Sequence, residues 1–101
     1  MASIIRGTTP TLIYKFKIVD VSEIIKAYLT IKQGSILIEK SLNDAVPGTD
    51  TLSWTLTQEE TLSIGTRQAS IMLNWVTSDG TRGASGKSVL YIEDNHIEEV
   101  I

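Results

Sequence analysis

Between Thr51 and Trp75 the spacing of apolar residues changes twice, and this constrains the fold more than any other part of the sequence. Apolar and polar residues alternate from Leu52 to Thr57, which is typical of a strand with one buried face. Thr57 and Glu60 have the spacing of a capping box, so a helical turn is predicted directly after that strand. Gly65 is predicted to end the turn, after which strict alternation returns. The segment therefore predicts a strand, a helical turn and a long returning strand in an all-β domain.

The alternation also predicts which side chains of this segment lie in the core. Four apolar residues are expected to be largely buried: Leu56, Ile71, Leu73 and Trp75. Trp54 and Trp75 lie in phase with apolar neighbours on their strands. Both are therefore predicted to pack in the core, and not to form an aromatic platform for a sugar.

Further alternating segments, separated by turn-forming residues, predict the other strands. The predicted strands cover residues 12–18, 27–31, 36–42, 52–56, 67–77 and 89–92, after an extended start at 3–6. The predicted connections are a kink at 7–10, a short turn capped by Asp20 or Ser22, hairpin turns at 33–35 and 78–81, and a loop at 43–50. Asp79 and Gly80 are expected to supply positive φ angles, and Gly83 and Gly86 to mark a bulge or an irregular edge.

Six or seven short strands without a long helix favour a two-sheet sandwich over a closed barrel. With 101 residues and 42% hydrophobic residues, the chain is expected to form a single domain over 1–101 with a core of its own. Acidic residues gather near the C-terminus, so a frayed acidic tail is expected over about 93–101.

Composition argues against several classes of protein. The chain has no cysteine, which excludes disulfides, thiolate metal sites and a cysteine nucleophile. A net charge of −3 argues against a nucleic-acid partner, and Lys15 and Lys17 share one strand face, as solvated lysines usually do. No apolar run is long enough to span a bilayer, and the first ten residues lack the basic and apolar regions of an export signal. We therefore expect no nucleic acid and no membrane among the partners.

No group of residues has the pattern of an active site. The one histidine, His96, lies beyond the last predicted strand, where no scaffold holds it. The acidic residues around it do not have the spacing of a calcium loop, and Gly80, Gly83 and Gly86 do not form a phosphate loop. Of the adjacent pair Glu59 and Glu60, the second is already assigned to the capping box. We expect no enzyme activity, no cofactor and no metal site.

Four short segments occur in an order that resembles a known group of proteins. They are Arg6–Thr11, Ala27–Gly34, Leu56–Thr61 and Thr77–Gly80. This order resembles small proteins encoded in the tail regions of phages and prophages of Gram-positive bacteria. The layout, from residue 6 to about residue 92, is similar to the immunoglobulin-like N-terminal domain of phage baseplate upper proteins, which hold the receptor-binding proteins.

The resemblance implies an all-β, immunoglobulin-like antiparallel β-sandwich of six or seven strands with one or two short helical turns. It implies a non-enzymatic structural or assembly protein of the virion, in the tail, the baseplate or a decoration, assembled in the cytoplasm of the bacterial host. A baseplate upper protein continues into further segments, whereas this sequence stops at Ile101, which favours a stand-alone accessory protein. The partners implied are other virion proteins and further copies of the chain.

Protein–protein contact is expected at strand edges and at the two ends of the chain. The candidate interaction residues are Ser3, Ile4, Ile5 and Arg6, together with the segment after Ile92, and removal of residues 1–6 is expected to leave the fold intact. The alternative function is a module that binds a carbohydrate or a host surface. Tyr28 is the candidate for that function, because it lies off the apolar face of its strand. A small enzyme is a third reading, which no constellation of residues supports.

Overall fold

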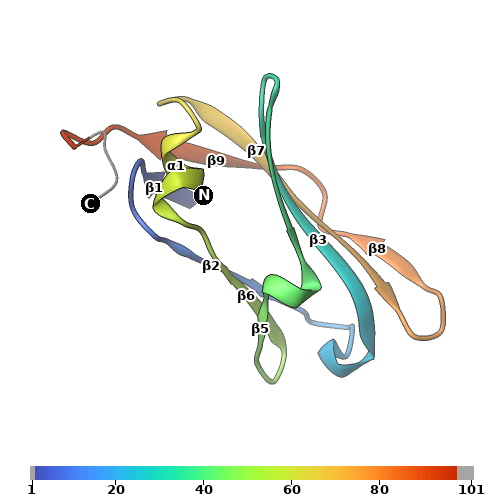
Figure 1. The fold of residues 1–101 in the computed structure, drawn as a ribbon. Coiled ribbons are helices and arrows are strands. Elements are labelled where there is room, and N and C mark those ends of the chain that lie inside the picture. The colour runs from blue at the N-terminus through green and yellow to red at the C-terminus, as the bar shows by residue number, and fades with distance from the viewer. Residues whose placement is uncertain (1, 98–101) are drawn as a thin grey trace.

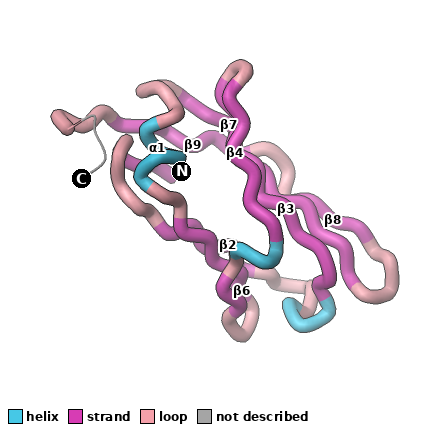
Figure 2. The backbone as a smooth tube through the Cα atoms, viewed as in Figure 1, coloured by secondary structure: helices cyan, strands magenta, loops and turns pink. Residues whose placement is uncertain are grey.

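The computed structural model describes residues 2–97, which form two β-sheets packed face to face (Figure 1). The molecule is elongated, with extents of 46 × 25 × 21 Å. The strands are β1 (Ala2–Ile5), β2 (Thr11–Lys15), β3 (Ile24–Gln33), β4 (Ile36–Ser41), β5 (Val46–Pro47), β6 (Thr51–Thr55), β7 (Gln68–Thr77), β8 (Arg82–Ala84) and β9 (Ser88–Glu93). The helical elements are the 3₁₀ turns η1 (Val21–Glu23) and η2 (Leu42–Asp44) and the helix α1 (Gln58–Leu62). Figure 2 shows how small the helical share is.

The larger sheet has the order β1-β9-β7-β3-β4, with β8 also paired to β7, and the smaller sheet has the order β2-β6-β5. In immunoglobulin terms these are the G–F–C–C′ and B–E–D groups of strands, connected in the same sequence. The chain is thus an all-β, immunoglobulin-like sandwich, as predicted. Two details of the prediction are wrong. Residues 2–97 contain nine strands and three short helical elements, where six or seven strands and one or two turns were predicted. In addition, β1 pairs with β9 in parallel, while the other pairs are antiparallel.

The core between the sheets has two adjoining parts. One part lies towards α1 and includes Ile4, Ile31 and Leu90, and the other surrounds Trp54 and Leu73. Burial removes these apolar side chains from water, which is the main favourable contribution to folding.

Two of the four side chains predicted for the core are deeply buried, and two are not. Leu56 and Leu73 are fully buried, as predicted. Ile71 and Trp75 are partly buried and pack against the core, less deeply than the other two. Trp75 lies near the end of the sandwich, where the rings of Tyr14 and Phe16 cover one side of its indole. The sheets do not extend far enough there to enclose it.

The strand predicted over 12–18 is shorter than expected. β2 ends at Lys15, the N–H of Phe16 still donates to the carbonyl of Asp50 at 2.8 Å, and the chain then bends. Phe16 is buried, but Ile18, predicted on the same face, is 97% exposed. The alternation of apolar and polar residues continues in the sequence past Lys15, but β6, the strand that pairs with β2, does not extend that far.

The helical turn begins where the capping box predicts. The N–H of Glu60 donates to Thr57 Oγ1 at 3.1 Å, and the N–H of Thr57 donates to Glu60 Oε1 at 2.8 Å. The predicted stop at Gly65 is wrong. The helix ends at Leu62, and the N–H of Ser63 caps the carbonyls of Glu59 and Glu60.

The predicted turns are confirmed, with two corrections. Asp20 caps η1 by accepting from the N–H of Ser22 at 3.0 Å. In the turn after β7 only Gly80 has a positive φ, of 86°, whereas Asp79 acts through its side chain. The region 43–50, predicted as a loop, contains the end of η2 and the short strand β5.

The predicted bulge lies between β8 and β9, which follow one another along the same edge of β7. Three residues from Ser85 to Lys87 face the two residues Met72 and Leu73, so one residue is extra. Gly86, with φ of 77°, takes up the irregular backbone. Gly83 has a different role: a Cβ there would lie 2.4 Å from the indole of Trp75, so the glycine makes room for that ring.

Candidate interaction surfaces

Four carboxylates in the described chain hold local turns together through hydrogen bonds. The pKa values of Asp20, Asp44, Glu60 and Asp79 are shifted, and all four are lowered. At Glu60 burial raises the pKa, but hydrogen bonds from Lys40 and from the N–H of Thr57 outweigh it, with the Lys40 Nζ 2.8 Å from Oε1. Such lowered values are those of carboxylates that hold turns together.

No metal-binding group or membrane-spanning helix is found within residues 2–97. No cluster of three or more His, Asp or Glu side chains is placed to hold a metal ion. His96 is exposed. No helix in this part of the chain is long and apolar enough to cross a membrane.

Three of the four predicted interaction residues at the start of the chain, Ser3, Ile4 and Ile5, belong to β1, the edge strand of the larger sheet, and Arg6 follows it. Ser3 and Ile5 are exposed, next to Tyr91 and Glu93 of β9. Ile4 is 6% exposed and packs in the core, so it is not available for contact in the folded protein, and its selection was wrong. The Arg6 guanidinium donates to the carbonyls of Ile64 and Leu62 at 2.8 and 2.9 Å. The segment is an integral strand, so we now expect its removal to destabilise the fold.

The described part of the predicted tail, residues 93–97, makes contacts with the start of the chain and is not frayed. Glu93 is the last residue of β9, and the Asn95 side chain donates to the carbonyl of Arg6 at 2.9 Å. The N–H of Ile97 donates to Asn95 Oδ1 at 3.1 Å. Residues 93–97 are therefore bound to the start of the chain, and residues 98–101 lie outside the described part.

Tyr28, the candidate for carbohydrate binding, lies on the outer face of the larger sheet. It is 43% exposed and stands between Ser41 of β4 and Asn74 of β7. The hollow beside it is polar in part and includes Lys26 and Asn43. Trp54 is buried and Trp75 half-buried, so neither tryptophan joins Tyr28 in an aromatic platform.

The free edge of β2 is a surface that the sequence prediction missed. β2 pairs with β6 on one side. Two hydrogen bonds at the ends of β2 fix which residues face β6: the N–H of Leu56 donates to the carbonyl of Pro10, and the N–H of Phe16 donates to the carbonyl of Asp50. Since every second residue of an antiparallel strand bonds to the same neighbour, the even-numbered residues of β2 direct their backbone groups to β6. The backbone groups of Thr11, Ile13 and Lys15 consequently point away from the sheet, to the open side.

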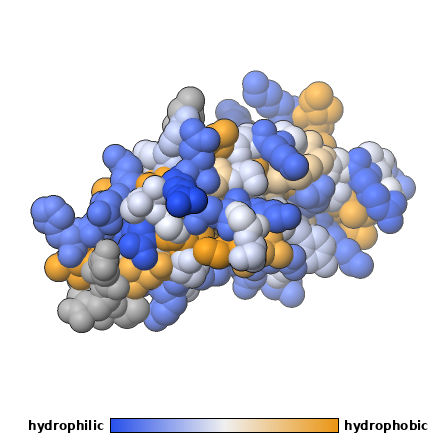
Figure 3. Space-filling model, turned by 90° about the horizontal axis from the view of Figure 1, so that it is seen from above, coloured by the Kyte–Doolittle hydropathy of each residue, from blue (hydrophilic) through white to orange (hydrophobic). Residues whose placement is uncertain are grey.

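Two exposed apolar side chains stand on either side of Ser53 on the outer face of the smaller sheet. Ile13 stands beside Ser53, and Ser53 beside Val46, and the two apolar side chains are each 68% exposed. Figure 3, which shows one face of the molecule, has hydrophobic residues at the surface in separate groups between hydrophilic ones. The signal for Ile13 was present in the sequence, as an apolar residue in the polar phase of its strand.

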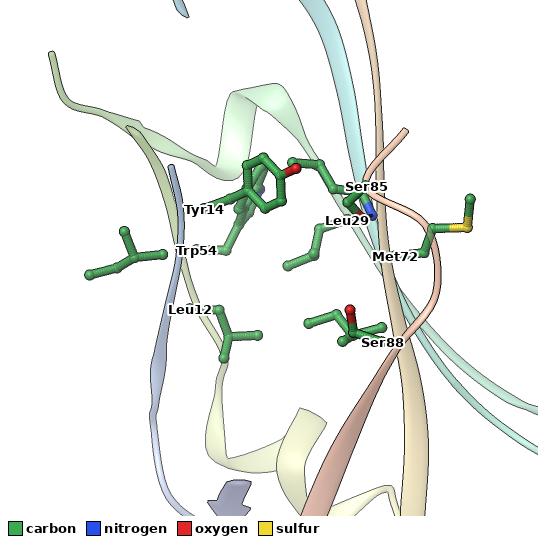
Figure 4. Close-up of a pocket in the computed structure, with 10 residues that line it drawn as sticks. Leu12, Tyr14, Leu29, Trp54, Met72, Ser85 and Ser88 are labelled. Carbon is green, nitrogen blue, oxygen red and sulfur yellow. Dashed lines mark hydrogen bonds between the residues drawn. The ribbon is translucent and has the colours of Figure 1, made fainter. Parts of the chain in front are cut away.

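A pocket of about 150 Å³ opens between the β2 edge and the β8–β9 bulge. Figure 4 shows Leu12 and Tyr14 of β2 on one side, Ser85 and Ser88 on the other, and Leu29 between them. Ser85 closes the edge of β7, since its hydroxyl accepts from the N–H of Leu73 at 2.9 Å and its own N–H donates to the Leu73 carbonyl at 2.8 Å. The pocket is lined mainly by apolar side chains and lies where an immunoglobulin domain has its A strand beside B.

Comparison with known proteins adds little to this description. No protein-family model matches the chain, and no curated protein matches it. Among solved structures, murine CRIg is similar over 93% of this chain and 91% of that chain, at 11% sequence identity and a TM-score of 0.45. The strand order described above is the basis on which the fold is assigned.

Proposed function

We propose that this protein is a non-enzymatic structural or assembly module of a phage or prophage particle, which acts through protein–protein contacts. The observation that carries the contact function is the free edge of β2, where an exposed isoleucine stands among unpaired backbone groups. Exposed apolar edge strands are surfaces to which other chains add. The placement in a tail, baseplate or decoration is supported by the order of short segments that resembles phage tail-region proteins.

Copies of the chain are proposed to associate with one another and with other virion proteins in the particle. Ser3 and Ile5, on the outer face of edge strand β1, remain the proposed contacts for copies of the chain. Individual contacts of this size are weak, but repetition on a symmetric particle makes them effective through multivalency.

Sedimentation of assembled particles tests the proposal. The chain, expressed with a small tag in a lysogenic host, is expected to co-sediment with particles through a density gradient after induction, at a fixed ratio to the other virion proteins. Recovery in the soluble fraction alone would contradict the virion role. Hydrolysis of a cell-wall or nucleotide substrate by the purified protein would contradict the non-enzymatic role.

The second candidate function is recognition of a carbohydrate or host surface through Tyr28, which is favoured by the exposure of its ring on the outer face of the larger sheet. A glycan array distinguishes the two functions. Binding that is lost in Tyr28→Ala and kept in Tyr91→Ala would favour the carbohydrate function, since both tyrosines lie on strands of the same sheet.

A further inference from the structure

We propose that the free edge of β2 and the pocket beside it bind an extended segment of a partner protein, which adds a fourth strand to the smaller sheet. The inference rests on the proposed function and deepens it, because it names the surface and the chemistry of the partner. Three features of the site carry it: the backbone of β2, the apolar pocket and two exposed lysines close in the sequence to residues of the site.

The backbone of β2 requires an extended ligand. Thr11, Ile13 and Lys15 each direct an N–H and a carbonyl to the open side, at the spacing of a β-ladder. Only another extended backbone presents acceptors and donors at that spacing along its whole length. Ile13, in the middle, would be covered by the added strand.

The pocket requires an apolar side chain on that strand. Side chains of an added strand alternate between the outer face and the space between the sheets, so every second one points towards the pocket. A volume of about 150 Å³ accommodates a group about the size of benzene, such as the end of a Leu, Met or Phe side chain. Leu12, Leu29 and Ile71 supply an apolar lining for it.

Two exposed lysines lie close in the sequence to residues of the site. Lys17 follows the end of β2 and Lys87 lies in the β8–β9 bulge, and both are exposed. Within residues 2–97 neither forms an ion pair, whereas Lys15 lies 3.7 Å from a carboxylate oxygen of Asp50. An acidic residue near the end of the bound segment complements these lysines.

A second copy of this chain fits the site less well than a free segment. If β2 paired with β2 of another copy, Leu12 and Tyr14 of that copy would stay packed against their own core and would leave the pocket unfilled. A contact between two five-residue strands also buries far less than the roughly 1,200 Å² of a stable interface. A tail or linker with uncommitted side chains both pairs with the edge and fills the pocket.

Selection of peptides from a display library of random dodecamers, with the intact protein as bait, tests the proposal. The expected winners alternate apolar residues over at least five positions and carry an acidic residue near one end. The best peptide is then synthesised, and its Kd for the parent and for variants is measured by fluorescence anisotropy. No enrichment over the bare support would overturn the proposal.

Two proline variants form a matched pair. In Ile13→Pro the lost N–H faces the open side, so the fold tolerates the change, but the added strand loses a hydrogen bond and the backbone clashes with it. We expect the Kd of the selected peptide to rise at least tenfold. Leu37→Pro makes the same change at the free edge of β4, where the N–H also points outward because Ile36 closes the turn with Gln33. It should leave the Kd unchanged, and equal binding by Ile13→Pro and the parent would overturn the proposal.

Ser88→Leu tests the pocket separately. Ser88 is exposed at the start of β9 and lines the pocket, so a leucine there fills it from the side without disturbing the strand. The Kd of the peptide should rise about tenfold.

If Ile13→Pro instead turns an oligomer of the parent into a monomer in light scattering, the edge belongs to a second copy and the proposal is overturned. Failure of all peptides, with co-sedimentation of the chain still observed, overturns the strand site and leaves the proposed function standing.

Discussion

At the level of single residues, the two tryptophans show that equal phase in a strand does not mean equal burial. Trp54 lies in the central strand of the smaller sheet, is fully buried, and donates its indole N–H to the carbonyl of Ser41 at 2.9 Å. Trp75 is in phase with Leu73, but near the end of its strand. It packs on Tyr14, Phe16 and the flat surface left by Gly83.

Trp54→Ala is therefore expected to destabilise the protein by about 3–5 kcal/mol, because it leaves a cavity and an unpaired carbonyl. Trp75→Ala should cost less, about 2 kcal/mol, since part of the indole is already in contact with water. Chemical denaturation of the two variants measures the difference. A Trp75→Ala variant that is as unstable as Trp54→Ala would contradict the burial described for the two rings.

Asp79 makes the turn after β7 sensitive to acid. The hydroxyl of Thr77 and the N–H of Thr81 donate to its Oδ1, and these bonds lower its pKa to about 2, from an ordinary value of 3.8. Because the folded form holds the proton less tightly than the unfolded chain, this contribution to stability is complete above about pH 5 and is lost as the pH falls towards 2.

Asp79→Asn keeps an oxygen that accepts the same hydrogen bonds but does not titrate. The difference in unfolding free energy between the parent and this variant should be constant from pH 7 to about pH 5 and should shift against the parent below pH 4. Thermal unfolding followed by circular dichroism at a series of pH values measures it. Parallel curves for the two proteins down to pH 2 would show that Asp79 has no special role.

At the level of elements, α1 is fixed from both sides. Its capping box orders the first turn, and the Thr61 hydroxyl and the Gln58 amide donate to the carbonyls of Thr8 and Gly7 at 2.8 and 3.0 Å. The loop after the helix is held by Gln33, whose amide both donates to and accepts from the backbone of Gly65, at 3.0 and 2.7 Å. This small helix thus links the hairpin of the larger sheet to the entry of β2.

Thr57→Ala is expected to cost about 1 kcal/mol of unfolding free energy, because it removes the side-chain oxygen that accepts from the N–H of Glu60. Glu59→Ala, on the exposed side of the same turn, is the control and should change stability by less than about 0.5 kcal/mol. Urea denaturation of both variants provides the measurement. Equal, negligible effects would mean that the capping box contributes nothing.

Local patterns in the sequence predicted most of the elements, because strands, hairpins and caps depend on neighbouring residues. The capping box at Thr57 and the hairpins around Gly34 and Gly80 are such cases. The parallel pairing of β1 with β9 was not predictable in this way, since it joins residues almost ninety positions apart. For the same reason the free edge of β2 was missed: whether a strand has a free edge depends on the strands around it.

At the level of the whole molecule, the first and last strands complete one another. Each residue of β1 is paired with a residue of β9, and the N–H of Arg6 extends the ladder to the carbonyl of Glu93 at 3.0 Å. Ile4 then reaches the same part of the core as Leu90 and Ile92. We therefore expect the stability of the domain to depend on residues 2–6.

Ile4→Ala is expected to destabilise the protein by about 2–5 kcal/mol, because a buried side chain is lost from the core. Ser3→Ala, on the exposed face of the same strand, is the matched control and should be nearly silent. Deletion of residues 1–6 should lower the melting temperature by more than either substitution. A deletion variant with the melting temperature of the parent would show that β1 is dispensable.

The parallel pairing of β1 with β9 also decides how the protein responds to force. Because the two strands run in the same direction, tension on the two ends of the chain pulls β1 from its Ala2 end and β9 from its Glu93 end, in opposite directions along the ladder. The hydrogen bonds are then loaded together in shear, whereas an antiparallel pair of end strands would unzip one bond at a time. Stretched by its ends, the domain gives way only when the whole ladder slips.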